Sequence, residues 1–188
     1  MKKIIGFILI LMSLNSYGNS LFWIGMGSTT HNFLTAQVDA IGTTKIIEFA
    51  PTVIMGLNIP FIYNGLYLTP GIGYASFTTK DNTSRNEYIL QYHFTQELTS
   101  WFLFQFGLSN YITKIGGKGG SIDLNNGSGT ATFYTPSTTK TSYTASVDLG
   151  GELALTNSIS TRLQFSILRF LSSERRRVSH LITLNYFF

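Results

Sequence analysis

The sequence of 188 residues contains no cysteine. Disulfides therefore add nothing to its stability, and anchoring through a lipid-modified N-terminal cysteine is excluded. Charged residues are scarce, at 12%, and no stretch holds the 18 or more uninterrupted apolar residues of a membrane helix. Mean hydropathy is nevertheless positive, at +0.16. Such a chain either stays in water or lies in lipid as a closed β-barrel, in which every backbone group is paired internally.

Residues 1–18 predict a cleaved signal peptide. Two lysines precede an apolar core over residues 4–14, which is too short to span a bilayer as a helix. Ser16 and Gly18 supply the small residues, two apart, that a signal peptidase requires. An N-terminal membrane anchor is the alternative, and the short apolar core disfavours it. Cleavage would leave residues 19–188 as one domain and lower the formal net charge from +4 to +2, a balance that gives no reason to expect nucleic-acid binding.

Eight segments alternate with a period of two, which indicates strands with two different faces. One face carries bulky apolar residues and the other carries small or polar ones. We predict strands near residues 21–29, 45–57, 65–78, 85–95, 101–115, 142–155, 160–171 and 178–188. Short connections alternate with longer ones, as in outer-membrane barrels. The pattern predicts an all-β fold, an eight-stranded antiparallel up-and-down transmembrane β-barrel with both termini at the short-turn end.

Alternation alone does not say which face points inward, because a soluble barrel places its bulky residues inside. The bulky faces carry almost no charge, as lipid contact requires, and the aromatic residues suit two interfacial girdles. The girdle candidates are Phe61, Tyr63, Tyr67, Trp101, Tyr186 and Phe188 on the short-turn side, and Tyr74, Phe77, Tyr88, Tyr111 and Tyr143 on the other. We therefore expect the small and polar residues to face the interior.

The predicted interior is polar. Its candidates are Glu48, Gln91, His93, Gln105, Asp148, Glu152, Arg162 and Gln164. An eight-stranded barrel is just wide enough for its own side chains to fill it, so we expect a plugged interior rather than a pore. A turn centred on Asn157 places Glu152 opposite Arg162. We expect these two to form an ion pair, because an unpaired buried charge is costly.

Two prolines lie within predicted strands, where each removes a hydrogen-bond donor from a ladder. If the turn is centred between Pro60 and Phe61, then Pro51 and Pro70 lie opposite each other. We expect a bulge or a water molecule there.

The sequence ends in SHLITLNYFF, and alternate residues share one face: His180, Ile182, Leu184, Tyr186 and Phe188. Residues 178–188 resemble the C-terminal assembly signal of bacterial outer-membrane proteins. The chain from residue 19 onward resembles the small eight-stranded barrels of the OmpA/OmpX type, in architecture and terminal motif rather than residue by residue. The resemblance implies a place in the outer membrane of a Gram-negative cell envelope, contact with membrane lipid and lipopolysaccharide, and recognition by the outer-membrane assembly machinery.

We expect a structural or surface-interaction role for a monomeric protein: membrane integrity, adhesion or ligand contact through the longer loops. The candidates for contact with lipopolysaccharide are Arg169, Arg175, Arg176, Arg177 and Lys114. Guanidinium groups bind phosphate in a bidentate manner, which favours this interpretation. The alternative is an ordinary solvated loop.

No catalytic, metal or cofactor site is predicted. Some barrels of the resembled type are lipid A deacylases or acyltransferases with Ser and His at the membrane rim, and such a site needs a nucleophile, a base and an orienting acid within reach. His93 faces the predicted interior, with no Ser and acid set identified beside it, and His31 is expected in a loop. His180 follows Ser179, but neighbours on a strand point to opposite faces. A lipid A-modifying enzyme and a soluble periplasmic barrel with an apolar ligand remain as alternatives.

Overall fold

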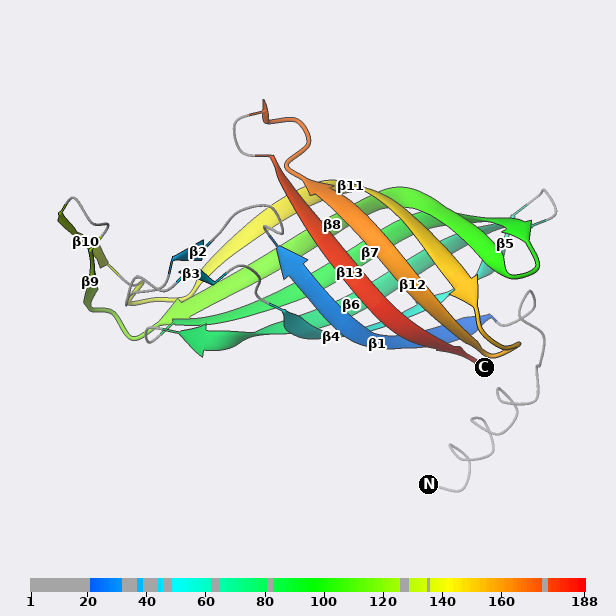
Figure 1. The fold of residues 1–188 in the computed structure, drawn as a ribbon, viewed down its shortest axis with the longest axis horizontal. Helices are drawn as coiled ribbons and strands as arrows, with labels where there is room; N and C mark the ends of the chain where they lie inside the picture. Colours follow the sequence, from blue (N-terminus) through cyan, green and yellow to red (C-terminus); the bar gives the residue numbers. More distant parts are fainter. Residues whose placement is uncertain are drawn as a thin grey trace, which may run out of the picture.

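The computed structural model shows a closed β-barrel with two small hairpins outside its wall (Figure 1). The structure describes residues 21–31, 37–38, 44–45, 49–61, 65–80, 83–125, 129–134, 136–173 and 176–188. The predicted signal peptide lies outside the described residues. No helix in the described part of the chain is long and apolar enough to cross a membrane.

Eight strands form the wall, and each pairs antiparallel with its neighbours in the chain. They are β1 (Phe22–His31), β4 (Ala50–Leu57) continued by β5 (Ile59–Pro60), β6 (Leu66–Lys80), β7 (Thr83–Thr99), β8 (Phe102–Gly117), β11 (Lys140–Ala154), β12 (Ile159–Leu168) and β13 (Arg177–Phe187). Pairing of β1 with β13 closes the ring. The hairpins are β2 (Gln37–Val38) with β3 (Thr44–Lys45), and β9 (Ser121–Asn125) with β10 (Thr130–Tyr134). The predicted eight-stranded up-and-down barrel is confirmed.

The two ends of the barrel differ. The end that holds the connections β5–β6, β7–β8 and β11–β12 also holds both ends of the barrel sequence, Phe22 and Phe188, and we call it the turn end. The opposite end, with the connections β1–β4, β6–β7, β8–β11 and β12–β13, is the loop end. In Figure 1 the turn end lies on the right, and the hairpins project from the loop end on the left.

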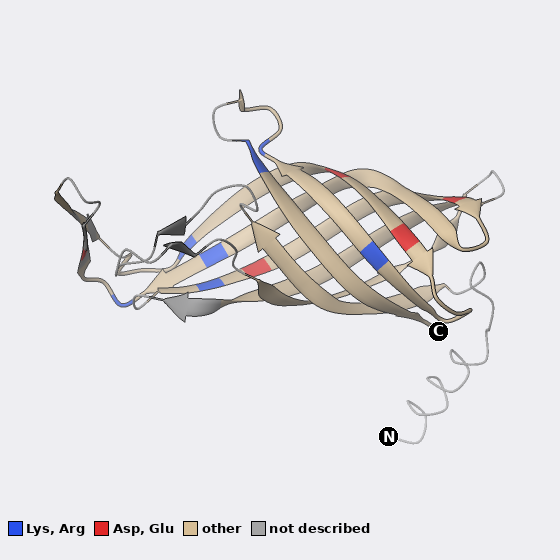
Figure 2. Cartoon of the chain, viewed as in Figure 1, with Lys and Arg blue, Asp and Glu red and all other residues tan. Residues whose placement is uncertain are grey.

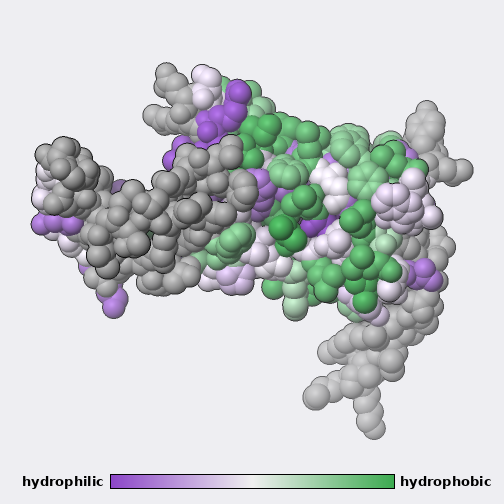
Figure 3. Space-filling view, viewed as in Figure 1, coloured by the Kyte–Doolittle hydropathy of each residue, from purple (hydrophilic) through white to green (hydrophobic). Residues whose placement is uncertain are grey.

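The bulky face of each strand points outward, as predicted. In β4 every second residue is buried and the residues between are exposed, and β12 behaves in the same way along most of its length. Exposed apolar residues include Ile72, Leu108 and Ile182. Figure 3 shows hydrophobic residues gathered over the visible barrel wall, and Figure 2 shows few charged residues along it. Of the predicted interior residues, Glu48 lies outside the described residues, and the others are all buried.

Two aromatic residues of the girdle predicted on the side opposite the short turns were assigned wrongly. Tyr111 and Phe77 point into the barrel, where they are 1% and 5% exposed. Tyr111 has the inward parity of its strand, so its side chain enters the interior. The phenol is stable there because its hydroxyl finds a polar partner. Tyr74 and Tyr88 do lie on the outer surface, with ring centroids 5.4 Å apart. On the short-turn side, Tyr67 also has inward parity and lines a small cavity inside the barrel, and Tyr63 lies outside the described residues.

The predicted pairing of Pro51 with Pro70 is also wrong. Pro51 faces Ser28 of β1, and Pro70 pairs with Tyr92 of β7. The turn that leads into β6 is centred later in the chain than the prediction assumed, so the two prolines lie at different heights. β4 and β5 pair with β6 on either side of Pro70, but Pro70 itself has no partner in those two strands. This agrees with the N–H that proline lacks.

Candidate functional site

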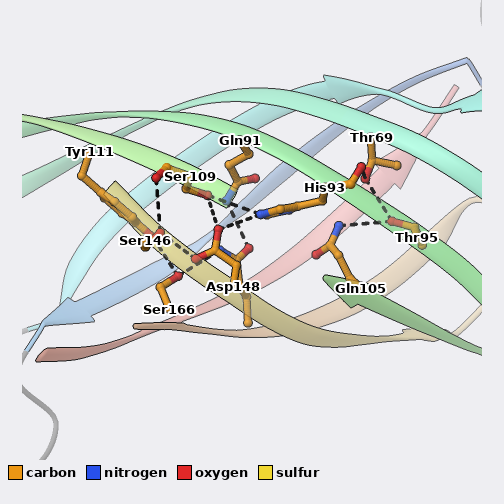
Figure 4. Close-up of polar contacts among 11 residues, drawn as sticks. Thr69, Gln91, His93, Thr95, Gln105, Ser109, Tyr111, Ser146, Asp148 and Ser166 are labelled. Carbon is orange, nitrogen blue, oxygen red and sulfur yellow. Dashed lines mark hydrogen bonds and ion pairs between the residues drawn. The ribbon is translucent and has the colours of Figure 1, made fainter. Parts of the chain in front are cut away.

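A histidine–aspartate pair spans three strands in the middle of the barrel. His93 of β7 and Asp148 of β11 both face Gly107 of β8, so the three residues form one row. Because Gly107 has no side chain, the imidazole of His93 lies across β8, and its Nε2 is 2.8 Å from Oδ2 of Asp148 (Figure 4). A Cβ on Gly107 would come within 2.6 Å of Cδ2 of His93 and would collide with the backbone oxygen of Tyr92. This position therefore requires glycine.

Two serines complete the surroundings of Asp148. The hydroxyl of Ser146 donates to Oδ1 at 2.7 Å, and the hydroxyl of Ser109 donates to Oδ2. Each of these side chains is at most 3% exposed. The carboxylate is therefore well supplied with hydrogen bonds in a site that water barely reaches, as a buried charge requires.

A second set of polar contacts crosses the barrel beside this pair. Tyr111 and Ser166 share a hydrogen bond of 3.0 Å, and the amide of Gln164 donates to the same serine oxygen at 3.1 Å. Gln91, from the opposite wall, donates to Oε1 of Gln164 at 3.1 Å. These side chains tie β7 and β8 to β12 through the interior.

The prediction that no Ser and acid set lies beside His93 is wrong, but the set is not arranged as a catalytic triad. A triad uses one ring nitrogen for the serine and the other for the acid. Here Nε2 approaches both Ser109, at 3.3 Å, and Asp148, while Nδ1 has no partner among the described residues. His93 is also 0% exposed, so a substrate could not reach it. The cluster is a buried hydrogen-bonded network around the carboxylate of Asp148.

Nearer the turn end, the structure places Glu152 of β11 directly opposite Arg162 of β12. Nε and Nη2 of the arginine lie 2.8 Å and 2.7 Å from Oε2 of the glutamate. Ser160 donates to Oε1. The guanidinium also stacks over Trp23, with Cζ 4.2 Å from the ring centroid. The indole lies so close to Gly56 that a Cβ there would come within 2.7 Å of it.

A cavity of about 160 Å³ opens at the loop end, and we call it the loop-end vestibule. The residues that line it include His31, Arg85, Glu87, Tyr111, Arg169 and Arg177. Nε2 of His31 lies 2.5 Å from Oε2 of Glu87, and Thr113 donates to Oε1 of the same carboxylate at 2.6 Å. Figure 2 shows basic residues gathered toward this end of the barrel.

The predicted lipopolysaccharide contacts lie in different places. Lys114 is on the outer surface, with its ammonium 5.1 Å from the ring centroid of Tyr88. Arg176 donates to the backbone oxygen of Phe170 at 3.1 Å. Arg177 lines the vestibule, and Arg175 lies outside the described residues.

Arg169, another of the predicted lipopolysaccharide contacts, lies just beyond the end of β12. Its φ of 55° is left-handed, which breaks the alternation at the end of β12. The side chain lies at the rim, where it borders both the vestibule and a shallow outer depression beside Tyr143 and Leu171.

Alternate residues of β13 lie on the outer face, as the terminal motif predicted. Ile182 and Leu184 are more than half exposed, and His180 packs edge-on against Phe165 with ring centroids 4.8 Å apart. Phe188 contacts the rings of Tyr186 and Phe22 at centroid distances of 5.0 Å and 5.3 Å, and its N–H donates to the backbone oxygen of Phe22. The terminal residues therefore hold β13 against β1, where the ring closes.

No protein-family model matches the chain, and no curated protein matches its sequence. Solved barrels do match its fold. Ail, the attachment invasion locus protein of Yersinia pestis, aligns over 89% of this chain and 96% of its own with a TM-score of 0.52 and 6% identity. Neisserial surface protein A covers 89% of this chain and 97% of its own, with a TM-score of 0.49 and 15% identity. At such identities the likeness concerns the fold alone, which is the eight-stranded architecture of the OmpA/OmpX type.

Proposed function

We propose that this chain is an integral outer-membrane protein of a Gram-negative cell envelope, with a plugged interior and a structural or surface-interaction role exercised through its loop end. The observation that carries the proposal is the reversed placement of residues: bulky apolar side chains outside, and polar or charged ones inside. Ile72, Leu108 and Leu184 are each at least 55% exposed. Such a wall is expected to aggregate in water, whereas in lipid it is the stable arrangement.

The same placement weighs against a soluble barrel that carries an apolar ligand. That alternative needs an apolar interior, because a ligand of this kind gains its affinity from apolar lining. The middle of this barrel instead holds Gln91, Gln105, Gln164 and the His93–Asp148 pair, each at most 1% exposed. Gln91 binds Gln164, His93 binds Asp148, and Gln105 donates to the hydroxyl of Thr95.

The interior contacts support a plug. At the turn end, a cavity of only about 10 Å³ lies beside the Glu152–Arg162 pair. The His93–Asp148 and Gln91–Gln164 contacts lie between it and the loop-end vestibule. Because eight strands leave little room beyond their own side chains, we expect no stable open-channel current from the folded protein in a planar bilayer.

The role at the surface rests on the loop end. The β9–β10 hairpin projects beyond the wall (Figure 1), and Tyr134 on it is 84% exposed. The name of Ail, an attachment invasion locus protein, agrees with surface contact. Among the basic residues of this end, Lys114, Arg169 and Arg176 are exposed and available to lipopolysaccharide phosphates. The outer face of β13 is the proposed signal for the assembly machinery.

An accessibility experiment tests the location and the orientation together. An epitope inserted between Asn125 and Gly129, in the β9–β10 hairpin, should bind antibody on intact cells. The same epitope inserted between Asn157 and Ser158, at the turn end, should bind only after the outer membrane is opened. Labelling of the second insertion on intact cells would contradict the orientation. Recovery of either protein in the soluble periplasm would contradict the location.

A further inference from the structure

The loop-end vestibule exposes its positive charge and hides its negative charge. Arg169 and Arg177 are exposed, and the side chain of Arg85 is 32% exposed. The side chain of Glu87 is 2% exposed and is engaged by His31 and Thr113, and Nη2 of Arg85 lies 3.6 Å from its Oε1. Among the described residues that line the cavity, the groups that a ligand would meet first are therefore guanidiniums. Basic groups around a recess attract anions more strongly than the same groups on an open surface.

These guanidiniums come from opposite walls. Arg85 is on β7 and Arg177 is on β13, which lie across the ring from each other. Both line the same cavity, together with Thr113, Ser142 and Thr144. Arginines that face one another across a space of this kind can bind different oxygens of one group, with hydroxyls as further donors.

The backbone at Arg169 adds a third guanidinium to the rim. A non-glycine residue with left-handed φ is uncommon and persists only where its surroundings hold it. Here the N–H of Arg169 donates to the backbone oxygen of Ala145, and its own oxygen accepts from the N–H of Ser172, both at 2.9 Å. The bend ends the strand alternation and leaves the side chain at the vestibule.

We propose that the loop-end vestibule binds one tetrahedral oxyanion, a phosphate or a sulfate, either as the free ion or as a monoester of a small sugar. A cavity of about 160 Å³ corresponds to about five waters at roughly 30 Å³ each. That space accommodates one such group and part of a sugar. Guanidinium forks match the oxygens of this anion in a bidentate manner. This anion site deepens the proposed function. It rests on the proposed function in one respect, because the orientation in the membrane decides from which side the ligand enters.

Isothermal titration of the folded protein tests the inference. The detergent should be a maltoside, because a phosphocholine head group would compete for the site. Inorganic phosphate and glucose 6-phosphate are the probes, and glucose is the neutral control. The proposal expects saturable one-to-one binding of at least one anion, weakened by added NaCl, and no binding of glucose. Tighter binding of glucose 6-phosphate identifies the ester as the ligand, and equal binding identifies the free ion.

A matched pair of variants decides whether the vestibule is the site. Arg177→Gln should weaken anion binding at least about tenfold, because charge-assisted hydrogen bonds are lost. Lys118→Gln removes the same charge from an exposed position away from the vestibule lining and should leave binding within about twofold. Each variant is first checked for folding by its heat-dependent gel mobility. Absence of saturable binding, or equal weakening by both variants, would overturn the inference.

The two proposals fail separately. Binding in detergent does not depend on where the protein lies in a cell. A titration without binding therefore overturns the anion site and leaves the epitope result standing, while a misplaced epitope contradicts the proposed location and leaves the titration standing.

Discussion

Removal of Glu152 should destabilise the barrel by more than one lost contact suggests. The side chain of Arg162 is 3% exposed, and its Nε and Nη2 both approach Oε2 of Glu152. Glu152→Gln would leave that guanidinium buried without its counter-charge, at a cost of about 3–5 kcal/mol. The ring of Trp23 lies over the guanidinium with or without the carboxylate, so this contact does not change the difference between the two proteins. We therefore expect the free energy of unfolding to fall by about 3–5 kcal/mol.

A double-mutant cycle separates this coupling from general damage. Arg162→Met alone should also destabilise the protein, because it leaves a buried carboxylate. The double variant should be more stable than the sum of the single effects predicts, by about 2–3 kcal/mol. Reversible urea unfolding in phosphatidylcholine vesicles, followed by tryptophan fluorescence, gives each free energy. A coupling energy below about 0.5 kcal/mol would refute the reasoning, because additive effects mark independent sites.

Three further changes follow from the same packing. Gly107→Ala should lower the free energy of unfolding by about 1–3 kcal/mol in the same urea assay, because the site would be overpacked. Gly129→Ala is the control: a Cβ there would meet nothing within 4 Å, so the free energy of unfolding should change by less than about 0.5 kcal/mol. Phe188→Ala should lower the urea midpoint, because it removes the ring that packs on Phe22 where β13 meets β1; an unchanged midpoint would contradict this role. Trp23→Ala should produce a small conductance in planar bilayers where the unsubstituted protein shows none, and an equally closed variant would argue against the indole as part of the plug.

The strands and their faces could be predicted because the period of a strand is two. A slip of one residue would turn every apolar side chain inward, so the pattern in β4 or β12 allows one choice of face. The Glu152–Arg162 pairing followed from a short turn, which fixes register nearby. The girdle assignment failed for Tyr111 and Phe77 because it used position along the strand and disregarded parity. Tyr111 shares the inward parity of Gln105 and Ser109.

The His93–Asp148 pair could not be placed from the sequence. Its row crosses β7, β8 and β11, and the connection between β8 and β11 is too long to fix a register. The available signal was Gly107, a glycine on the inward face between two buried polar residues. The proline pairing failed for a related reason: the centre of the turn before β6 was misplaced, and an error in the centre shifts every pair beyond it.

The proposed function requires this barrel to face lipid with its apolar wall. The most direct measurement is a detergent gel of isolated outer membranes, with boiled and unboiled samples beside the soluble periplasmic fraction. Because every backbone group of a closed barrel is paired internally, the folded protein should resist the detergent until it is heated. We expect a heat-dependent shift in mobility, found only in the outer-membrane fraction. A heat-insensitive protein in the soluble periplasm would contradict it.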